Sequence, residues 1–270
     1  MNSNSTNSTI KENYNNTNLH LVSPINISTL SNSIYNPNYK VDILPSKNPN
    51  EVSFTKEEHD AQPFKSMKDI KLITNYFLSH NQYRNYLVFI CGINFGLREW
   101  DLLHIRFKDI INNDNTFKVG FNVFEKKTRH TRITPKNRYI PINNAVKQAV
   151  IIYLQHNPNT SLDDYMFRNE SHNKANINKP MTRKGLEYII KSITKKLNIE
   201  GRFNTHSLRK TFSYQYMMKN RDNPRALYKL QKILGHSSPA ITLAYIGLDK
   251  EELINAYMNL NLGIDYELME

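Results

Sequence analysis

The sequence contains one cysteine in 270 residues, and none of its apolar runs is long enough to cross a bilayer. A single cysteine excludes a disulfide framework and a zinc site made of cysteines. Cys91 lies within the longest apolar run, so we expect a buried, reduced thiol in a cytoplasmic protein. That run, residues 86–97, is about 12 residues long, whereas a membrane span needs ~20. The N-terminus also lacks the basic and apolar regions of a secretory signal.

Acidic residues are in deficit. Lys and Arg number 36 against 24 Asp and Glu, which gives a net charge of +12 and a pI of about 9.5. Residues 1–60 carry a net charge of −2, so the other 210 residues carry +14. This excess of positive charge predicts an anionic partner, and no membrane partner is expected.

The chain divides into two unequal parts. Its first 50 residues contain 13 Asn and only scattered apolar residues, a composition that cannot bury enough surface to offset the entropy of ordering. We therefore expect a flexible Asn- and Ser-rich tail over residues 1–60 and one folded domain over residues 61–270.

Periodicity within residues 61–270 predicts a mainly α fold with a small antiparallel β-sheet (α+β). Thr205 is expected to cap one helix, and Asn223-Pro224 to begin the next. Helices are predicted over residues 67–80, 83–94, 97–103, 144–156, 182–197, 205–220, 223–235 and 239–245, and strands over residues 107–111, 116–124 and 131–142.

Two clusters could carry chemistry near the C-terminal end. His206 and Arg209 are three residues apart on a predicted helix, so both side chains lie on one face. His236 follows Gly235 in a tight link between helices, and Tyr245 comes nine residues later. Each feature alone also fits an ordinary role: an exposed helix face, a turn, or a tyrosine used for packing.

Two further clusters precede them. Gly96-Leu97-Arg98 places an arginine at the mouth of a helix, and Lys126-Lys127-Thr128 links two predicted strands. The ordinary interpretation of Arg98 is a solvated charge, and that of Lys126 and Lys127 is a pair of lysines that keep the strands soluble. The spacing of His, Cys and acidic residues predicts no metal site, and we expect no cofactor.

Taken in order, these clusters resemble the tyrosine recombinases, the family of phage integrases and Xer-type resolvases. The resemblance covers roughly residues 64–260 and is most specific in THSLRKTFSYQYM…LQKILGHSSPAITLAYIGLD. It implies a tyrosine-recombinase-like catalytic domain. The family typically adds a helical core-binding domain before it, but residues 1–60 have the composition of a tail, so we expect no complete core-binding domain here. The resemblance also implies a mobile-element enzyme that cleaves and rejoins double-stranded DNA through a 3′-phosphotyrosine, for integration, excision, inversion or resolution.

The resemblance assigns roles residue by residue. Arg98 and Arg209 take the places of the arginines that clamp the phosphate, and Tyr245 that of the nucleophile. Asp101 stands where the family usually has Glu, and either Lys126 or Lys127 can be the hairpin acid, with Lys127 preferred because Thr follows it. The complete expected set is Arg98, Lys127, His206, Arg209, His236 and Tyr245.

The assigned residue types suit this reaction. A phenol can form a reversible phosphodiester, two guanidinium forks match the phosphate oxygens, and a lysine can protonate the leaving oxygen. Positive side chains then replace the ions of a two-metal nuclease. Basic residues around the hairpin are expected to contact DNA phosphates: Arg129, Arg132, Lys136 and Arg138.

Residues 249–270 carry a net charge of −5 and an apolar stripe at helical spacing, formed by Leu253, Ala256, Tyr257 and Leu260. A helix folded onto its own domain is one interpretation. The resemblance implies another, in which the segment docks on a neighbouring protomer of a tetramer assembled on paired sites, with an accessory directionality factor as a further partner. Type IB topoisomerase activity and non-catalytic DNA-binding regulation remain the alternative functions.

Overall fold

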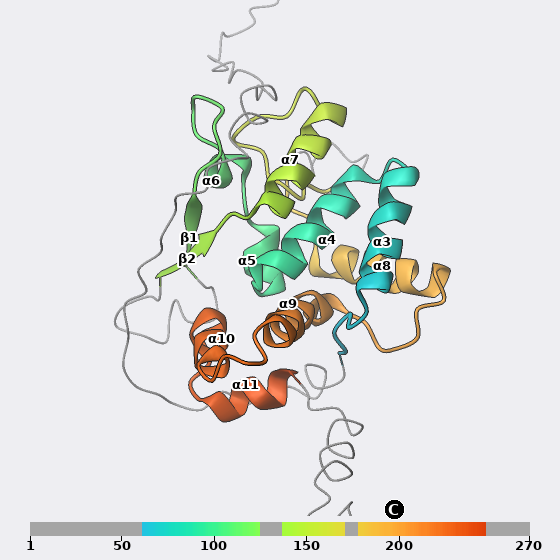
Figure 1. Ribbon diagram of the computed structural model, residues 1–270. Coiled ribbons are helices and arrows are strands. Elements are labelled where there is room, and N and C mark those ends of the chain that lie inside the picture. The colour runs from blue at the N-terminus through green and yellow to red at the C-terminus, as the bar shows by residue number, and fades with distance from the viewer. Residues whose placement is uncertain (1–60, 125–136, 171–177, 247–270) are drawn as a thin grey trace, which may run out of the picture.

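The computed structural model describes residues 61–124, 137–170 and 178–246. In these ranges the fold is mostly helical with a two-stranded antiparallel sheet, so the expected fold class is confirmed (Figure 1). The elements are α3 (Met67–Ser79), α4 (Tyr83–Phe95), α5 (Glu99–Leu103), α6 (Phe107–Ile110), β1 (Gly120–Phe124), β2 (Asn137–Pro141), α7 (Asn144–His156), α8 (Arg183–Lys196), α9 (Thr205–Lys219), α10 (Ala226–Leu234) and α11 (Pro239–Ile246).

Helix α4 lies at the centre of the helical body, packed against α3, α7 and α9 (Figure 1). Leu87, Val88 and Cys91 on α4 are fully buried, as are Ala149 and Val150 on α7. Burying a side chain such as Leu or Val stabilises the fold by about 1.5–3 kcal/mol relative to leaving it exposed. The core therefore fixes the ends of α4, and the candidate site begins at its C-terminal end.

Side-chain caps explain why several helices begin where the sequence predicts. Ser66 Oγ accepts from the backbone N–H groups of Lys68 and Asp69 at the start of α3. Asn143 caps α7 and Thr182 caps α8 in the same way. Each cap satisfies an amide that has no partner inside its helix.

Two predicted helix starts are displaced. The cap of α9 is Asn204 rather than Thr205, because the Asn204 Oδ1 accepts from the His206 N–H. Helix α10 begins at Ala226, three residues after Asn223. Asn223 instead closes a turn, in which its side chain accepts from the Arg225 N–H and its carbonyl from the Ala226 N–H.

The predicted strand over residues 107–111 is wrong, because residues 107–110 form α6. The Asp109 carboxylate accepts the Arg106 N–H and caps this short helix, a local preference that hydrophobic alternation does not reveal. The second predicted strand begins later than expected, because β1 starts at Gly120 rather than at residue 116. It pairs with β2, and Phe121 lies opposite Ile140 on the buried face. Residues 131–136 of the third predicted strand lie outside the described ranges.

In the described parts of the chain, no helix has the length and apolar character that a membrane span requires. Residues 1–60, which we expect to be a tail, fall outside those parts, as does the segment 249–270.

Candidate active site

The Gly-Leu-Arg motif forms the turn between α4 and α5. Gly96 ends α4 with φ +58°, a left-handed conformation that favours glycine, and Leu97 is buried. Arg98 directly precedes α5, and its backbone carbonyl accepts the Leu102 N–H at 2.9 Å. Asp101, three residues further on, is 5% exposed. The turn therefore places the half-buried Arg98 at a defined position beside the core.

Helix α9 carries its polar motif toward the interior. His206 and Arg209 are 9% and 3% exposed, so the ordinary interpretation of an exposed helix face is wrong. Arg209 Nη1 donates to the Gly96 carbonyl at 2.8 Å and Nη2 donates to the Leu234 carbonyl at 2.7 Å. One guanidinium thus joins the last turn of α4 to the last turn of α10.

His236 occupies a second glycine turn. Gly235 ends α10 with φ +69°, and the His236 N–H donates back to the Gln231 carbonyl at 3.1 Å. The ring Nδ1 lies 3.0 Å from Thr242 Oγ1 on α11. These contacts on both sides hold the imidazole between α10 and α11.

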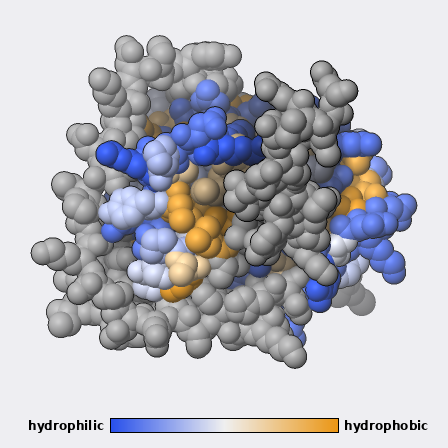
Figure 2. All heavy atoms as spheres, turned by 60° about the horizontal axis from the view of Figure 1, so that its bottom comes forward, coloured by the Kyte–Doolittle hydropathy of each residue, from blue (hydrophilic) through white to orange (hydrophobic). Residues whose placement is uncertain are grey.

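Tyr245 on α11 lies against this imidazole. The two ring centroids are 5.2 Å apart at an interplanar angle of 72°, an edge-to-face contact. Tyr245 is 7% exposed, its hydroxyl is buried, and it packs with Leu230 and Leu234 of α10. Seen from the side of α10 and α11, the surface has an apolar area bordered by hydrophilic residues (Figure 2). The phenol is therefore held inside the site rather than presented to solvent.

Two cations lie over the Tyr245 ring. Arg209 Cζ is 5.9 Å and Lys210 Nζ is 5.4 Å from the ring centroid. Lys210 is 6% exposed. Sequence reasoning missed this lysine, because only the fold shows that its helix position faces inward. Its place directly after the His-x-x-Arg motif was the one available signal.

The structure therefore gathers most of the expected site. Arg209 and His236 each lie against the Tyr245 ring, and Arg98 comes two residues after Gly96, whose carbonyl Arg209 bonds. His206 lies one helical turn before Lys210 on α9. Five expected residues lie outside the described ranges: Lys126, Lys127, Arg129, Arg132 and Lys136.

Arg138 is the one expected hairpin residue that the structure describes. It lies on β2 opposite Val123, and it is half-buried. Its Nη2 lies 3.2 Å from the Gly96 carbonyl and 3.4 Å from the Phe95 carbonyl. Two guanidinium groups, from Arg138 and Arg209, thus meet at the C-terminal end of α4, where the helix dipole favours positive charge.

A basic groove beside α8 also escaped the sequence analysis. It has a volume of about 690 Å³ between α8 and the segment that leads to α9. One carboxylate, that of Glu187, lines the groove together with five exposed basic residues: Arg183, Lys184, Lys191, Lys195 and Arg202. The concentration of lysine and arginine over residues 183–202 was the signal in the sequence.

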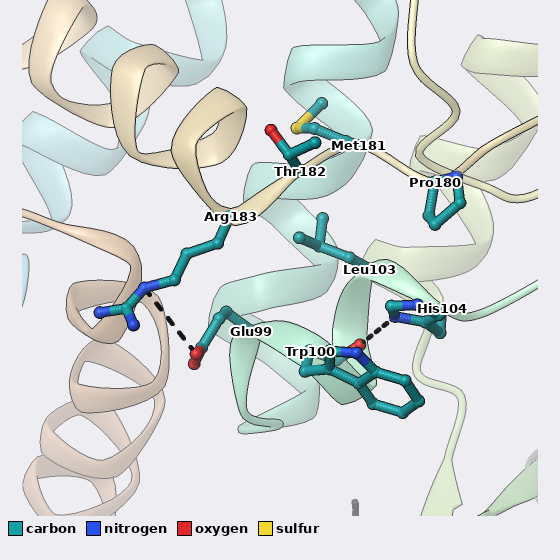
Figure 3. A pocket seen from close by; sticks show the side chains of 8 residues that line it. All are labelled: Glu99, Trp100, Leu103, His104, Pro180, Met181, Thr182 and Arg183. Carbon is teal, nitrogen blue, oxygen red and sulfur yellow. Dashed lines mark hydrogen bonds and ion pairs between the residues drawn. The ribbon is translucent and has the colours of Figure 1, made fainter. Parts of the chain in front are cut away.

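A smaller apolar pocket of about 280 Å³ lies between α5 and the start of α8 (Figure 3). Trp100 stacks on His104 at 3.8 Å, and His104 Nδ1 lies 2.7 Å from the Trp100 carbonyl. Arg183 Nε approaches the Glu99 carboxylate at 4.0 Å across the pocket. These contacts hold the first turn of α5, directly after Arg98.

Among the described residues, no group of three His, Cys, Asp or Glu side chains could hold a metal ion.

Comparison with known proteins identifies the family of the chain. The model of the phage integrase family matches residues 65–252. A probable integrase/recombinase YoeC of Bacillus subtilis is 33% identical over 199 residues, which cover 74% of this chain and 96% of YoeC. The tyrosine recombinase XerC of Pediococcus pentosaceus is 31% identical over 125 residues, 45% of this chain and 39% of XerC.

Solved structures share the fold. The crystal structure of XerA recombinase has a TM-score of 0.54 and 21% identity, covering 73% of this chain and 63% of that chain. XerH site-specific recombinase bound to a palindromic difH substrate has a TM-score of 0.51 and 17% identity. The match covers 72% of this chain and 51% of the XerH chain. With the family match over most of the chain, the conclusion is direct: the chain belongs to the phage integrase family and is a tyrosine-type site-specific recombinase.

Proposed function

We propose that this recombinase cleaves double-stranded DNA with Tyr245 and rejoins it by reversing the same step. The observation that carries the proposal is the convergence of Arg209 and His236 on the buried Tyr245 ring. A tyrosine used only for packing needs neither group beside it.

In the cleavage step, Tyr245 Oη attacks the scissile phosphorus and loses its proton. The bond from phosphorus to the 5′ oxygen breaks, and that oxygen takes up a proton, for which Lys127 is the proposed donor. The 3′-phosphotyrosine conserves the energy of the broken bond, so a DNA 5′ hydroxyl can attack it and release the tyrosine. No external energy source is needed for rejoining.

The proposed phosphate clamp consists of Arg98 and Arg209. Negative charge increases on the non-bridging oxygens in the transition state, and planar guanidinium groups bind such oxygens with charge-assisted hydrogen bonds. The two carbonyl bonds of Arg209 fix the plane of its guanidinium before DNA arrives. The proposed role of His236 is to bond a phosphate oxygen, and that of His206 is to accept a proton at the nucleophile.

DNA binding is supported by the charge distribution. We propose that the duplex lies along the basic groove of α8 and the hairpin residues Arg129, Arg132 and Lys136. Each neutralised phosphate contributes a slope of about −0.9 to the dependence of log affinity on log salt concentration. Such contacts position the protein without reading base sequence.

We further propose assembly as a homotetramer on paired sites. The acidic segment 249–270 would dock on the basic body of a neighbouring protomer, with opposite charges steering the contact. An accessory directionality factor is the remaining proposed partner.

A two-site assay tests the proposed function. Two labelled duplexes from the genome sequence flanking the coding region are incubated with the protein, and both covalent adducts and recombinant joints are measured. Recombinant joints with a transient adduct are expected. Relaxation of supercoiled plasmid without recombinant joints would indicate topoisomerase activity instead, and binding without any adduct would indicate a regulator.

A further inference from the structure

We infer that Lys210 is a positioning residue for the nucleophile, whose ammonium group stabilises the phenolate of Tyr245 at the start of the attack. This inference rests on the proposed role of Tyr245. It assigns a task to a lysine that takes no part in the steps described above.

Burial of Lys210 is the first observation. Lysine is rarely buried to 6% exposure, because removing an ammonium group from water is costly unless nearby groups compensate. Lys210 lies on the inward face of α9, one helical turn after His206 and next to Arg209. A solvent-facing lysine would have served equally well if solubility were its only role.

The position over the ring is the second observation. Lys210 Nζ lies over the Tyr245 ring, 5.4 Å from its centroid. A neutral phenol attracts such a cation only through the ring quadrupole. A phenolate spreads a full negative charge over oxygen and ring, so the same cation stabilises it much more. Because the ammonium group stabilises the phenolate more than the phenol, it favours deprotonation of Tyr245. The low dielectric of a buried site strengthens this electrostatic stabilisation.

The proton must pass to another group. An ammonium ion has three donor hydrogens and no acceptor, so Lys210 in its charged form cannot be the base. The O–H bond of Tyr245 breaks, its proton passes to His206 in the role proposed above, and the electron pair of the phenolate forms the bond to phosphorus. Lys210 keeps its own protons throughout.

Other charged or titratable groups near Tyr245 do not replace Lys210. Arg209 is further from the ring centroid, at 5.9 Å, and its terminal nitrogens are bonded to two carbonyls. His236 meets the ring with an edge-to-face contact. Tyr216 belongs to the same cluster, and burial raises the pKa of its phenol. Of the two cations that lie within 6 Å of the ring centroid among the described residues, Lys210 is the one outside the proposed phosphate clamp.

The direct test is a titration without DNA. Tyrosine is labelled with ¹³C at Cζ in the full chain, and the Tyr245 resonance is assigned by its loss in Tyr245→Phe. We expect the titration midpoint of Tyr245 to lie about one pH unit higher in Lys210→Met than in the parent. Lys210→Arg should restore it. Lys219→Met, which removes an exposed charge from the same helix, should leave it unchanged.

Cleavage kinetics provide a second readout. Adduct formation in a single turnover should be about tenfold slower in Lys210→Met at neutral pH and should recover at alkaline pH. If the Met variant does not fold, Lys210→Gln replaces it, because it also removes the charge but retains a polar group; the same results are expected. An unchanged Tyr245 midpoint in a folded neutral variant overturns the inference. A shifted midpoint without any adduct on Tyr245 supports the electrostatic effect and overturns the proposed function instead.

Discussion

Arg209 Nη1 donates a hydrogen bond to the carbonyl of Gly96 at 2.8 Å, which joins two positions separated by 113 residues of chain. Through Nη2 the same guanidinium also holds the Leu234 carbonyl. The turns that carry Arg98 and His236 are thereby tied to one side chain on α9. The arginine proposed to bind phosphate is thus also the residue that assembles the site.

Replacement of Arg209 by lysine should therefore impair both the proposed phosphate binding and the assembly of the site. A lysine has one nitrogen and no planar fork, so it cannot hold the two carbonyls and a phosphate together. We expect adduct formation at least about 100-fold slower and a free energy of unfolding lower by about 1–3 kcal/mol. Single-turnover kinetics and urea denaturation measure the two effects. Arg221→Lys, an exposed change just after α9, should alter neither, and full activity of Arg209→Lys would remove it from the clamp.

The Gly96 turn should tolerate no side chain. Its φ of +58° strains any other residue, and a Cβ there would lie 2.6 Å from Cδ1 of Phe212. We expect Gly96→Ala to lower the free energy of unfolding by about 3 kcal/mol and to slow adduct formation. Gly185→Ala in α8 has no positive φ, and its Cβ would lie 3.3 Å from Met181 Cγ and Thr182 Oγ1, so it should change stability by less than about 1 kcal/mol. Equal stability of the two variants would contradict this account of the turn.

Much of this architecture could be predicted from local signals. The predicted helix starts at residues 67 and 144 agree with the structure, the start at 182 is one residue early, and these helices begin after the capping side chains of Ser66, Asn143 and Thr182. The spacing of His206 and Arg209 also placed both on one helix face. Helix α6 was mistaken for a strand, because its four residues are too few to show a helical period.

Long-range contacts could not be predicted in this way. The bonds from Arg209 to the Gly96 and Leu234 carbonyls depend on the packing of α9 against α4 and α10. The burial of Lys210 depends on the same packing. Arg138 looked like one more hairpin cation until its register with Val123 placed it on the inner face of the sheet.

The inward contacts of Arg138 favour a role in holding α4 over a phosphate contact. In Arg138→Met we expect the free energy of unfolding to fall by about 1–2 kcal/mol, because the bond to the Gly96 carbonyl is lost. The salt dependence of DNA affinity should keep its slope. A slope reduced by about 0.9 would instead show that Arg138 neutralises a phosphate.

The acidic segment 249–270 should matter for exchange rather than for binding. A chain that ends at Asp249 is expected to bind and cleave a single site but to form no higher-order complex on native gels and no recombinant joints. Full-length chains with Leu253→Asp and Leu260→Asp, which disrupt the apolar stripe, should behave likewise. The control is the double variant Asn255→Asp with Asn259→Asp, which adds the same charge at positions outside the apolar stripe and should remain active. Normal recombination by the truncated chain would leave the segment a local helix.

Identification of the amino acid that becomes linked to DNA tests the central claim most directly. A suicide substrate traps the adduct, trypsin digests it, and mass spectrometry locates the nucleotide-bearing peptide. Residues 233–250 form a tryptic peptide with Tyr245 as its single tyrosine. We predict that this peptide carries the nucleotide and that Tyr245→Phe forms no adduct while binding DNA with nearly unchanged affinity. An adduct on another peptide, or one that persists in Tyr245→Phe, would contradict the account.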